Sequence, residues 1–429
     1  MAQREESPRS SSFYGWTVLA SSFLILFFTS GARYSLGVIF KPMIAEFGWD
    51  RGAISLAFFL NMTLFAFSLM AAGKLYDRYG LRWVIIVSSV FLSGGYILVS
   101  FVNAFWQFLL CYGIIAAIGL GGPSVTLMAT VTSKWFDRWR GAAVSTALSG
   151  HSLGQFVLIP LFTVFVSRYG WRASYFTIGL IMLGVNMTLA LWVIRGEPDD
   201  FGQKWFGDRD QERTPRQGGG VSSTEPPSDL TLREAMHTRS FWLFLIVMFI
   251  CGSGDFLVST HLIPFLTDHG VSSITAGNMF AWFGLMSLAG ILAAGPVSDL
   301  IGNKIPIVFT FVLRFLLFLL ILKYQNLGSF YGFALAFGFT VLITAPLTPT
   351  LIGRLYGFTH LGLMAGFITT VHHLGGGFWA YLGGVVFDQT GSYRLAFILS
   401  AIMAIVAVLC TLFIVERRHL PPSHRAEPS

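Results

Sequence analysis

The chain is an internal duplication, because residues of its first half return about 222 positions later. Each matching stretch is mostly apolar. The pairs at an offset of 222 are Pro42/Pro264, Glu46/Asp268, Gly48/Gly270, Gly73/Gly295, Asp77/Asp299 and Gly80/Gly302, and those at 221 are Gly141/Gly362, His151/His372, Leu153/Leu374, Gly154/Gly375, Gly170/Gly391 and Phe176/Phe397. The repeat predicts a duplicated bundle of membrane helices, with two halves that can rock about a shared central cavity.

The composition predicts that the lipid bilayer is the solvent. Hydrophobic residues make up 54% of the chain and charged residues 11%, against about 25% charged in an ordinary globular protein. We expect an all-α membrane protein of twelve helices, each long enough for a hydrocarbon core of about 30 Å. The expected spans are 14–40, 52–73, 83–102, 105–132, 141–166, 173–194, 241–266, 274–298, 304–323, 328–352, 363–386 and 394–415.

The net charge of +7 is explained by topology and not by a nucleic-acid partner. With the N-terminus inside, 20 of the 28 Lys and Arg residues fall in cytoplasmic segments. Such an excess marks the cytoplasmic side of a membrane protein. We therefore expect a multi-pass protein of the cytoplasmic (inner) membrane with both termini in the cytoplasm.

The long polar interval at 196–240 divides the chain into domains. It separates two six-helix bundles, 14–195 and 241–416, and short tails lie at 1–13 and 417–429. We expect a cytoplasmic linker, flexible around 209–229 with a short helix at 230–238; a regulatory role for it stays open. The three cysteines lie in apolar spans without disulfide or metal-ligand spacing, and we expect no metal and no cofactor.

A short motif occurs twice, in the loops after the second and eighth spans. These loops read GKLYDRYGLR at 73–82 and GPVSDLIGNK at 295–304. They resemble the G-x-x-x-D-R/K-x-G-R/K signature of the major facilitator superfamily. The resemblance implies two pseudo-symmetric six-helix bundles and a loop that latches one end of them together. The gating residues it implies are Gly73, Asp77, Arg78, Gly80 and Asp299.

A narrower resemblance, to the monocarboxylate transporters and the related oxalate/formate antiporter-like group, covers most of the chain. It is carried by GARYSLGV at 31–38, EFGWDRGAIS at 46–55, KWFDRWRG at 134–141, HHLGG at 372–376 and FDQTGSY at 387–393. Members move small carboxylates, often with a proton. They typically anchor the carboxylate with an arginine in helix 8 or a lysine in helix 11. Here span 8 has no basic residue, and span 11 offers histidines.

Two charged residues lie at matched depths in the first span of each half. Arg33 and Asp255 are related by the offset of 222. A charge inside the membrane costs about 2.5–3.5 kcal/mol on insertion scales, so it normally faces a cavity or a partner. We expect Arg33 to hold an anionic group, because guanidinium binds a carboxylate through two hydrogen bonds. Asp255 would pair with Arg33 in the empty state and release it on protonation; a purely structural ion pair is the alternative. Arg314, in span 9, fits a structural role.

Histidines and other polar groups within the spans complete the predicted site. Imidazole titrates near physiological pH and can relay protons, but for any single one of these histidines the sequence favours a hydrogen-bonded packing role. The predicted proton-coupling residues are Asp255 and His261. The predicted substrate-binding residues are Arg33, Tyr34, Asn61, Tyr112, His151, Asn278, Trp282, His372 and Tyr381.

The sequence therefore predicts a secondary transporter and no enzyme. A phosphate-binding G-x-x-x-x-G-K-[S/T] loop is absent from the sequence, which excludes ATP as the driving force. The predicted cargo is a small organic anion, a monocarboxylate, moved by alternating access with proton symport. Proton-coupled efflux of amphipathic compounds is the first alternative, and a membrane sensor that binds solute without moving it is the second.

Overall fold

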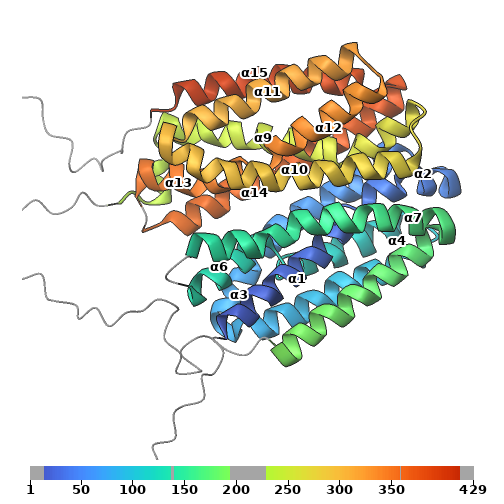
Figure 1. The fold of residues 1–429 in the computed structure, drawn as a ribbon, viewed down its shortest axis with the longest axis horizontal. Helices are drawn as coiled ribbons and strands as arrows, with labels where there is room; N and C mark the ends of the chain where they lie inside the picture. The colour runs from blue at the N-terminus through green and yellow to red at the C-terminus, as the bar shows by residue number, and fades with distance from the viewer. Residues whose placement is uncertain (1–13, 137–139, 194–228, 358, 416–429) are drawn as a thin grey trace, which may run out of the picture.

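The computed structural model describes residues 14–136, 140–193, 229–357 and 359–415, which are helical apart from short connections (Figure 1). The elements of the first half, including two π-helical segments, are α1 Gly15–Arg33, α2 Leu36–Phe47, α3 Arg51–Val99, α4 Phe105–Phe108, η1 Leu109–Ala116, α5 Ala117–Leu120, α6 Val125–Trp135, α7 Arg140–Thr188 and η2 Leu189–Val193. Those of the second half are α8 Leu232–Ala235, α9 Arg239–Asp268, α10 Ser273–Ile301, α11 Lys304–Lys323, α12 Leu327–Val341, α13 Thr344–Tyr356, α14 Leu361–Thr390 and α15 Arg394–Phe413.

These elements form twelve membrane spans in the described part of the chain. Ten stretches are long and apolar enough to cross a membrane. One of them, Gly141–Trp192, holds two spans, because its backbone turns at Gly170. The helix α14, rich in glycine and histidine, is the remaining span. The expected all-α fold of two six-helix bundles is confirmed.

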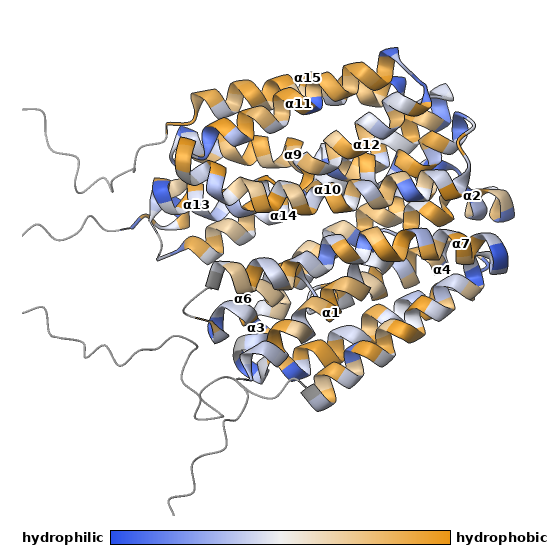
Figure 2. Cartoon of the chain, in the orientation of Figure 1, coloured by the Kyte–Doolittle hydropathy of each residue, from blue (hydrophilic) through white to orange (hydrophobic). Residues whose placement is uncertain are grey.

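The outer surface of the bundle suits lipid. Large apolar side chains are exposed along the outer helices, for example Leu316 and Leu409, at 53% and 50%. Figure 2 shows that apolar residues run along the helices and that hydrophilic ones gather toward their ends. In water such a surface would be an aggregation hazard, whereas in a bilayer it is satisfied.

The duplication is visible in the backbone. Three matched pairs of glycines adopt positive φ, a conformation that other residues rarely reach. They are Gly48/Gly270 (67° and 79°), Gly80/Gly302 (77° and 81°) and Gly170/Gly391 (80° and 68°). The chain therefore turns at the same places in both halves.

The packing of helices repeats as well. Gly154 of α7 lies against the backbone of Phe27 in α1, where an added Cβ would be 2.0 Å from the carbonyl oxygen. Its counterpart Gly375 of α14 lies against Phe249 of α9, at 2.6 Å. Phe27 and Phe249 are themselves 222 residues apart. Small residues at these points let the first and fifth spans of each half approach closely.

In the described part of the chain, the buried apolar packing shared by the two halves lies toward one end of the bundle. We call the end where α3 begins and α9 ends the closed end, and the end where α1 begins and α15 ends the open end. One buried apolar cluster spans both halves toward the closed end and includes Ile39, Phe58, Leu257 and Phe280. Toward the open end each half has a separate apolar cluster.

Candidate functional site

Arg33 lies where the first span breaks, between α1 and α2. The break comes directly after it, at Tyr34 and Ser35. Its Nη2 donates to the Met62 sulfur at 3.5 Å, and its guanidinium stands 4.6 Å from the ring centre of Phe65. The buried Nε has no hydrogen-bond partner. Among the described residues, no carboxylate oxygen lies within 4.0 Å of Arg33, so its positive charge has no acidic partner.

Asp255 does not pair with Arg33, which corrects the expected ion pair. Its Oδ1 lies 2.5 Å from Nη2 of Arg314, and both side chains are almost fully buried. Arg314 also donates to the Thr340 hydroxyl at 2.9 Å and to the carbonyl of Cys251 at 3.2 Å. The physical reason is that the long Arg314 side chain reaches from α11 to α9, and a buried guanidinium there requires its own counter-ion. The structural role expected for Arg314 therefore includes neutralising Asp255.

His151 and His372, which the repeat relates, each stand beside the charged residue of their own half. The His151 Nε2 lies 3.4 Å from the Tyr34 hydroxyl, next to Arg33. The His372 Nε2 lies 3.8 Å from Asp255 Oδ2, and its buried Nδ1 has no hydrogen-bond partner among the residues that the structure describes. We call Arg33, Tyr34, His151, Asp255 and His372 the central site.

The central site lies between the packed closed end and the separated open end. Arg33, Tyr34 and His372 are each partly exposed there. Phe256 joins the two halves: its ring centre is 5.6 Å from the Arg33 guanidinium and 5.8 Å from the His372 ring. Since Phe256 follows Asp255 as Tyr34 follows Arg33, the repeat could have identified it. The repeat gives no comparable indication for Met62 and Phe65, the other two residues that contact Arg33.

Asn61 and Tyr112 bind each other within the first half, which corrects their expected place in the cavity. Asn61 is 1% exposed, and its amide donates to the Tyr112 carbonyl at 2.6 Å. The Tyr112 ring stacks on Phe108 with centroids 5.2 Å apart. These residues hold the second and fourth spans together.

Asn278 and Trp282 lie on a face of α10 turned away from the central site, which is a second correction. Phe280 of the same helix meets the Tyr34 ring at 5.8 Å. Positions two residues before and after Phe280 stand about 160–200° around the helix from it. Both side chains are exposed, Trp282 at 42%. The remaining predicted ligand, Tyr381, stacks on Phe59 where α14 meets α3.

The closed end is held by an ion pair between the halves. Arg51 of α3 reaches Asp268 of α9 through both terminal nitrogens, at 2.8 and 3.0 Å. Lys41 of α2 lies 2.6 Å from the same carboxylate. The Arg51 Nη1 also donates to the Tyr393 hydroxyl at 2.8 Å. The first half supplies the cations of this contact and the second half the anion.

His261, predicted to couple protons, belongs to this closed end. Burial raises the pKa of the Tyr393 phenol above its ordinary value, so the hydroxyl keeps its proton. While accepting from Arg51, it donates to His261 Nδ1 at 2.9 Å. The other ring nitrogen, Nε2, then donates to the Ala380 carbonyl at 2.8 Å. Both ring nitrogens of neutral His261 are therefore hydrogen-bonded in this conformation.

Asp388 caps a helix of the opposite half. Its two carboxylate oxygens accept from the backbone amides of Arg51 and Gly52 at 3.0 and 2.6 Å. These are the first amides of α3, which a residue preceding the helix usually satisfies. Asp50 holds that position and makes no capping bond with its side chain. The cap of α3 therefore comes from α14.

The predicted gating residues lie at the open end. A Cβ added at Gly73 would meet nothing within 4 Å, and the same holds at Gly141, Gly295 and Gly362. Arg78 is exposed, and its guanidinium lies 5.2 Å from the ring centre of the adjacent Tyr79. The side chains of Asp77 and Asp299 lie outside the described residues, as do the linker from 196 to 228 and the two tails. The short helix expected at 230–238 is present as α8.

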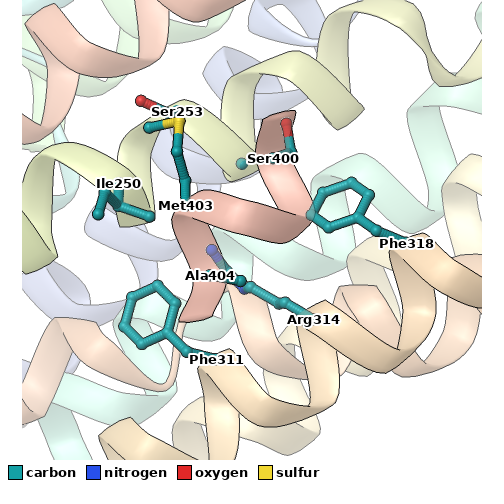
Figure 3. Close-up of a pocket in the computed structure, with 9 residues that line it drawn as sticks. Ile250, Ser253, Phe311, Arg314, Phe318, Ser400, Met403 and Ala404 are labelled. Atoms are coloured by element: carbon teal, nitrogen blue, oxygen red, sulfur yellow. The ribbon is translucent and has the colours of Figure 1, made fainter. Parts of the chain in front are cut away.

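A small pocket lies beside the buried ion pair, between α9, α11 and α15 (Figure 3). It offers about 10 Å³ of free space, roughly the room that one water needs. Ligand atoms of Cys251, Asp255 and His372 lie within 4.8 Å of one another. The Arg314 guanidinium touches the first two of these residues, and its charge disfavours a metal cation there.

The family model described as Major Facilitator Superfamily matches residues 22–272 and 244–429. The chain belongs to the major facilitator superfamily. The MFS-type transporter YcxA of Bacillus subtilis is 25% identical, with 90% of this chain and 92% of that one aligned. Monocarboxylate transporter 13 of Bos taurus is 23% identical over 96% and 92%, and human monocarboxylate transporter 11 is 25% identical over 90% and 80%.

Solved structures of superfamily members share the fold. A bacterial homologue of the human lysosomal transporter Spinster, in an inward-facing and occupied conformation, has a TM-score of 0.74 at 14% identity and aligns over 94% of this chain and 97% of its own. The nucleoside transporter NupG has a TM-score of 0.71 at 12% identity, over 94% and 99%. These relatives and neighbours are transporters and not enzymes, and the chain is a multi-pass membrane transporter of the same superfamily.

Proposed function

We propose that this transporter moves a small organic anion, a monocarboxylate, across the cytoplasmic membrane by alternating access and together with a proton. The observation that carries the proposal is that the Arg33 guanidinium has no acidic partner among the described residues. Asp255 is neutralised by Arg314, so the central site keeps one net positive charge. A monoanion matches that charge, and its carboxylate can accept two parallel hydrogen bonds from guanidinium.

Two further observations support this proposal. The aligned relatives include monocarboxylate transporters that match the chain along most of its length. The excess of Lys and Arg at the open end favours a cytoplasmic position for that end. On that assignment the conformation is inward-facing, and an anion from the cytoplasm would reach Arg33 from the open end while the Arg51 contacts block the other end.

Proton-coupled efflux of an amphipathic anion is the second candidate function. The observation in its favour is the apolar wall around the charge, where Phe65, Phe256 and Phe280 contact Arg33 or Tyr34. Such a wall would bind a larger apolar body behind the carboxylate. The two candidates share the anchor and differ in the size of the cargo.

Uptake into proteoliposomes tests the proposal. The purified protein is supplied with labelled lactate, pyruvate, butyrate or benzoate, with and without a proton gradient directed inward. We expect gradient-stimulated uptake that falls about 10- to 100-fold in Arg33→Gln, since hydrogen bonds to a charged group contribute about 1.5–3 kcal/mol. Arg33→Lys should retain part of it, because lysine keeps the charge and loses the bidentate geometry.

A matched control separates the anchor from general charge effects. Arg168 is exposed at the closed end of α7, and Arg168→Gln should transport like the wild type. Folding of each variant is checked by its elution from a size-exclusion column. Uptake of benzoate alone would favour the amphipathic cargo, and no uptake of any acid by folded wild-type protein would overturn the monocarboxylate proposal.

A further inference from the structure

We propose that His372 is the proton carrier of this transporter and that Asp255 is its fixed counter-ion. This inference rests on the proposed anion transport and assigns its coupling to one side chain. It differs from the expectation that Asp255 itself takes up the proton and releases Arg33. The first ground for the change is that Asp255 and Arg33 are not paired.

The carboxylate of Asp255 is already engaged on both oxygens. Its Oδ1 is held by Arg314 at 2.5 Å, and its Oδ2 lies 3.5 Å from the Cys251 sulfur and 3.8 Å from His372 Nε2. The Asp255 side chain is 6% exposed, against 15% for His372. A proton carrier must exchange with water during the cycle, and His372 is the more exposed of the two.

The ring of His372 has an unused proton acceptor. A carboxylate only accepts hydrogen bonds, so the nitrogen that faces Asp255, Nε2, carries hydrogen in the neutral ring. Nδ1 then bears the lone pair, and it has no hydrogen-bond partner. A proton from the medium binds there, and the imidazolium that forms lies beside the Asp255 carboxylate and can donate to the backbone carbonyl of Met248, which also favours the charged ring.

The charges around His372 come from four helices. Asp255 and Cys251 face it from α9, Arg314 from α11 and Arg33 from α1, while His373 is its neighbour on α14. Arg314 is neutralised by Asp255, which leaves Arg33 as the unbalanced charge. While the site is empty, the positive charge of Arg33 disfavours a proton on His372.

Anion binding at Arg33 cancels this repulsion and so favours the proton on His372. The coupling is reciprocal, because two ligands that affect each other's binding do so by the same factor. The site would then move an anion and a proton as a neutral pair. His151 is the matched residue of the first half, but it stands beside the cation Arg33, so the same pairing with a carboxylate is missing there.

Three assays on one set of proteoliposomes test the inference with labelled lactate as the probe. They are uptake driven by a proton gradient, exchange of labelled for unlabelled lactate without a gradient, and alkalinisation of the medium when lactate is added. In His372→Gln we expect loss of gradient-driven accumulation and no alkalinisation, while exchange, which needs no net movement of protons, falls but stays measurable above protein-free liposomes. His373→Gln is the matched control. The His373 ring is hydrogen-bonded to the Thr369 carbonyl of its own helix, so this variant should keep all three activities.

A second variant guards against misfolding of the first. Asp255→Asn combined with Arg314→Met removes the counter-ion without leaving a lone buried charge, and it too should exchange lactate without coupling. Gradient-driven accumulation by His372→Gln would overturn the inference while leaving anion transport intact. Wild-type lactate transport that ignores the gradient would do the same, and failure of the wild type to transport any acid would overturn both proposals.

Discussion

The two halves of this transporter share a backbone and differ in charge. In the first half, Arg33 stands at the end of a broken helix, and none of the described residues gives it an acidic partner. In the second, the matched residue Asp255 lies within the continuous helix α9 and is paired with Arg314. Glycine turns, helix contacts and the histidines His151 and His372 repeat between the halves, whereas the charge at the position of Arg33 and Asp255 changes sign. The difference teaches that duplication supplied the geometry and that substitution within it supplied two distinct sites.

The same division of charge holds where the halves meet. Lys41 and Arg51 of the first half bind Asp268 of the second, and Asp388 of the second half caps α3 of the first. Opposite charges on the two faces favour contact when the closed end is shut. The contacts between the halves at the closed end thus place cations in the first half and carboxylates in the second, as Arg33 and Asp255 do in the central site.

The largest difference between the two halves should appear in the stability of the folded protein when Arg33 or Arg314 is replaced. Arg314→Met leaves the Asp255 carboxylate buried without a counter-ion, and breaking a buried pair in this way costs about 3–5 kcal/mol. Arg33→Met removes a charge that has no acidic partner, so it should leave stability unchanged or raise it. Thermal unfolding in detergent, followed by loss of the monodisperse peak, measures both.

The double variant Arg314→Met with Asp255→Asn is the control for this comparison. It removes both charges, and it should recover most of the stability that Arg314→Met loses. Equal losses in Arg33→Met and Arg314→Met would show that the halves do not differ as described.

A smaller effect is expected at the closed end. Arg51→Ala removes the hydrogen bonds that Arg51 donates to Asp268 and Tyr393. A hydrogen bond that involves a charged group contributes about 1.5–3 kcal/mol. The population open at this end should rise about tenfold or more. Its measure is labelling of Ser55→Cys, a fully buried position beside Gly384, by a membrane-impermeant maleimide. Arg168→Ala should not change the labelling, and an unchanged rate in Arg51→Ala would remove Arg51 from the gate.

The sequence predicts the helices well, because length and apolarity decide a membrane span. Residues 304–323 are expected as a span and are found as one. The break between α1 and α2 was not foreseen, since Tyr34 and Ser35 are not helix breakers and Pro42 lies a full two turns later. Tertiary bonds, such as that from Tyr96 to the Ala32 carbonyl, hold the chain there.

The charged pair of the second half was missed for a related reason. The offset of 222 points from Asp255 to Arg33, and nothing in the sequence links Asp255 to Arg314, which lies 59 residues further on. Partner choice depends on which helices pack side by side. Likewise, the polarity of Asn278 suggests a ligand, but only the contact of Phe280 with Tyr34 fixes which face of α10 turns inward.

The smallest effect concerns the helix cap shared between the halves. Asp388→Ala frees the first amides of α3, and loss of a capping side chain costs about 1 kcal/mol. Maleimide labelling of Ser55→Cys should therefore rise about fivefold, less than for Arg51→Ala. Asp50→Ala is the matched control: Asp50 precedes the same helix but makes no capping bond in this conformation, so its loss should not increase labelling. If Asp50→Ala increased labelling as much as Asp388→Ala, the cap would belong to the first half alone, and α14 would not stabilise the closed end through it.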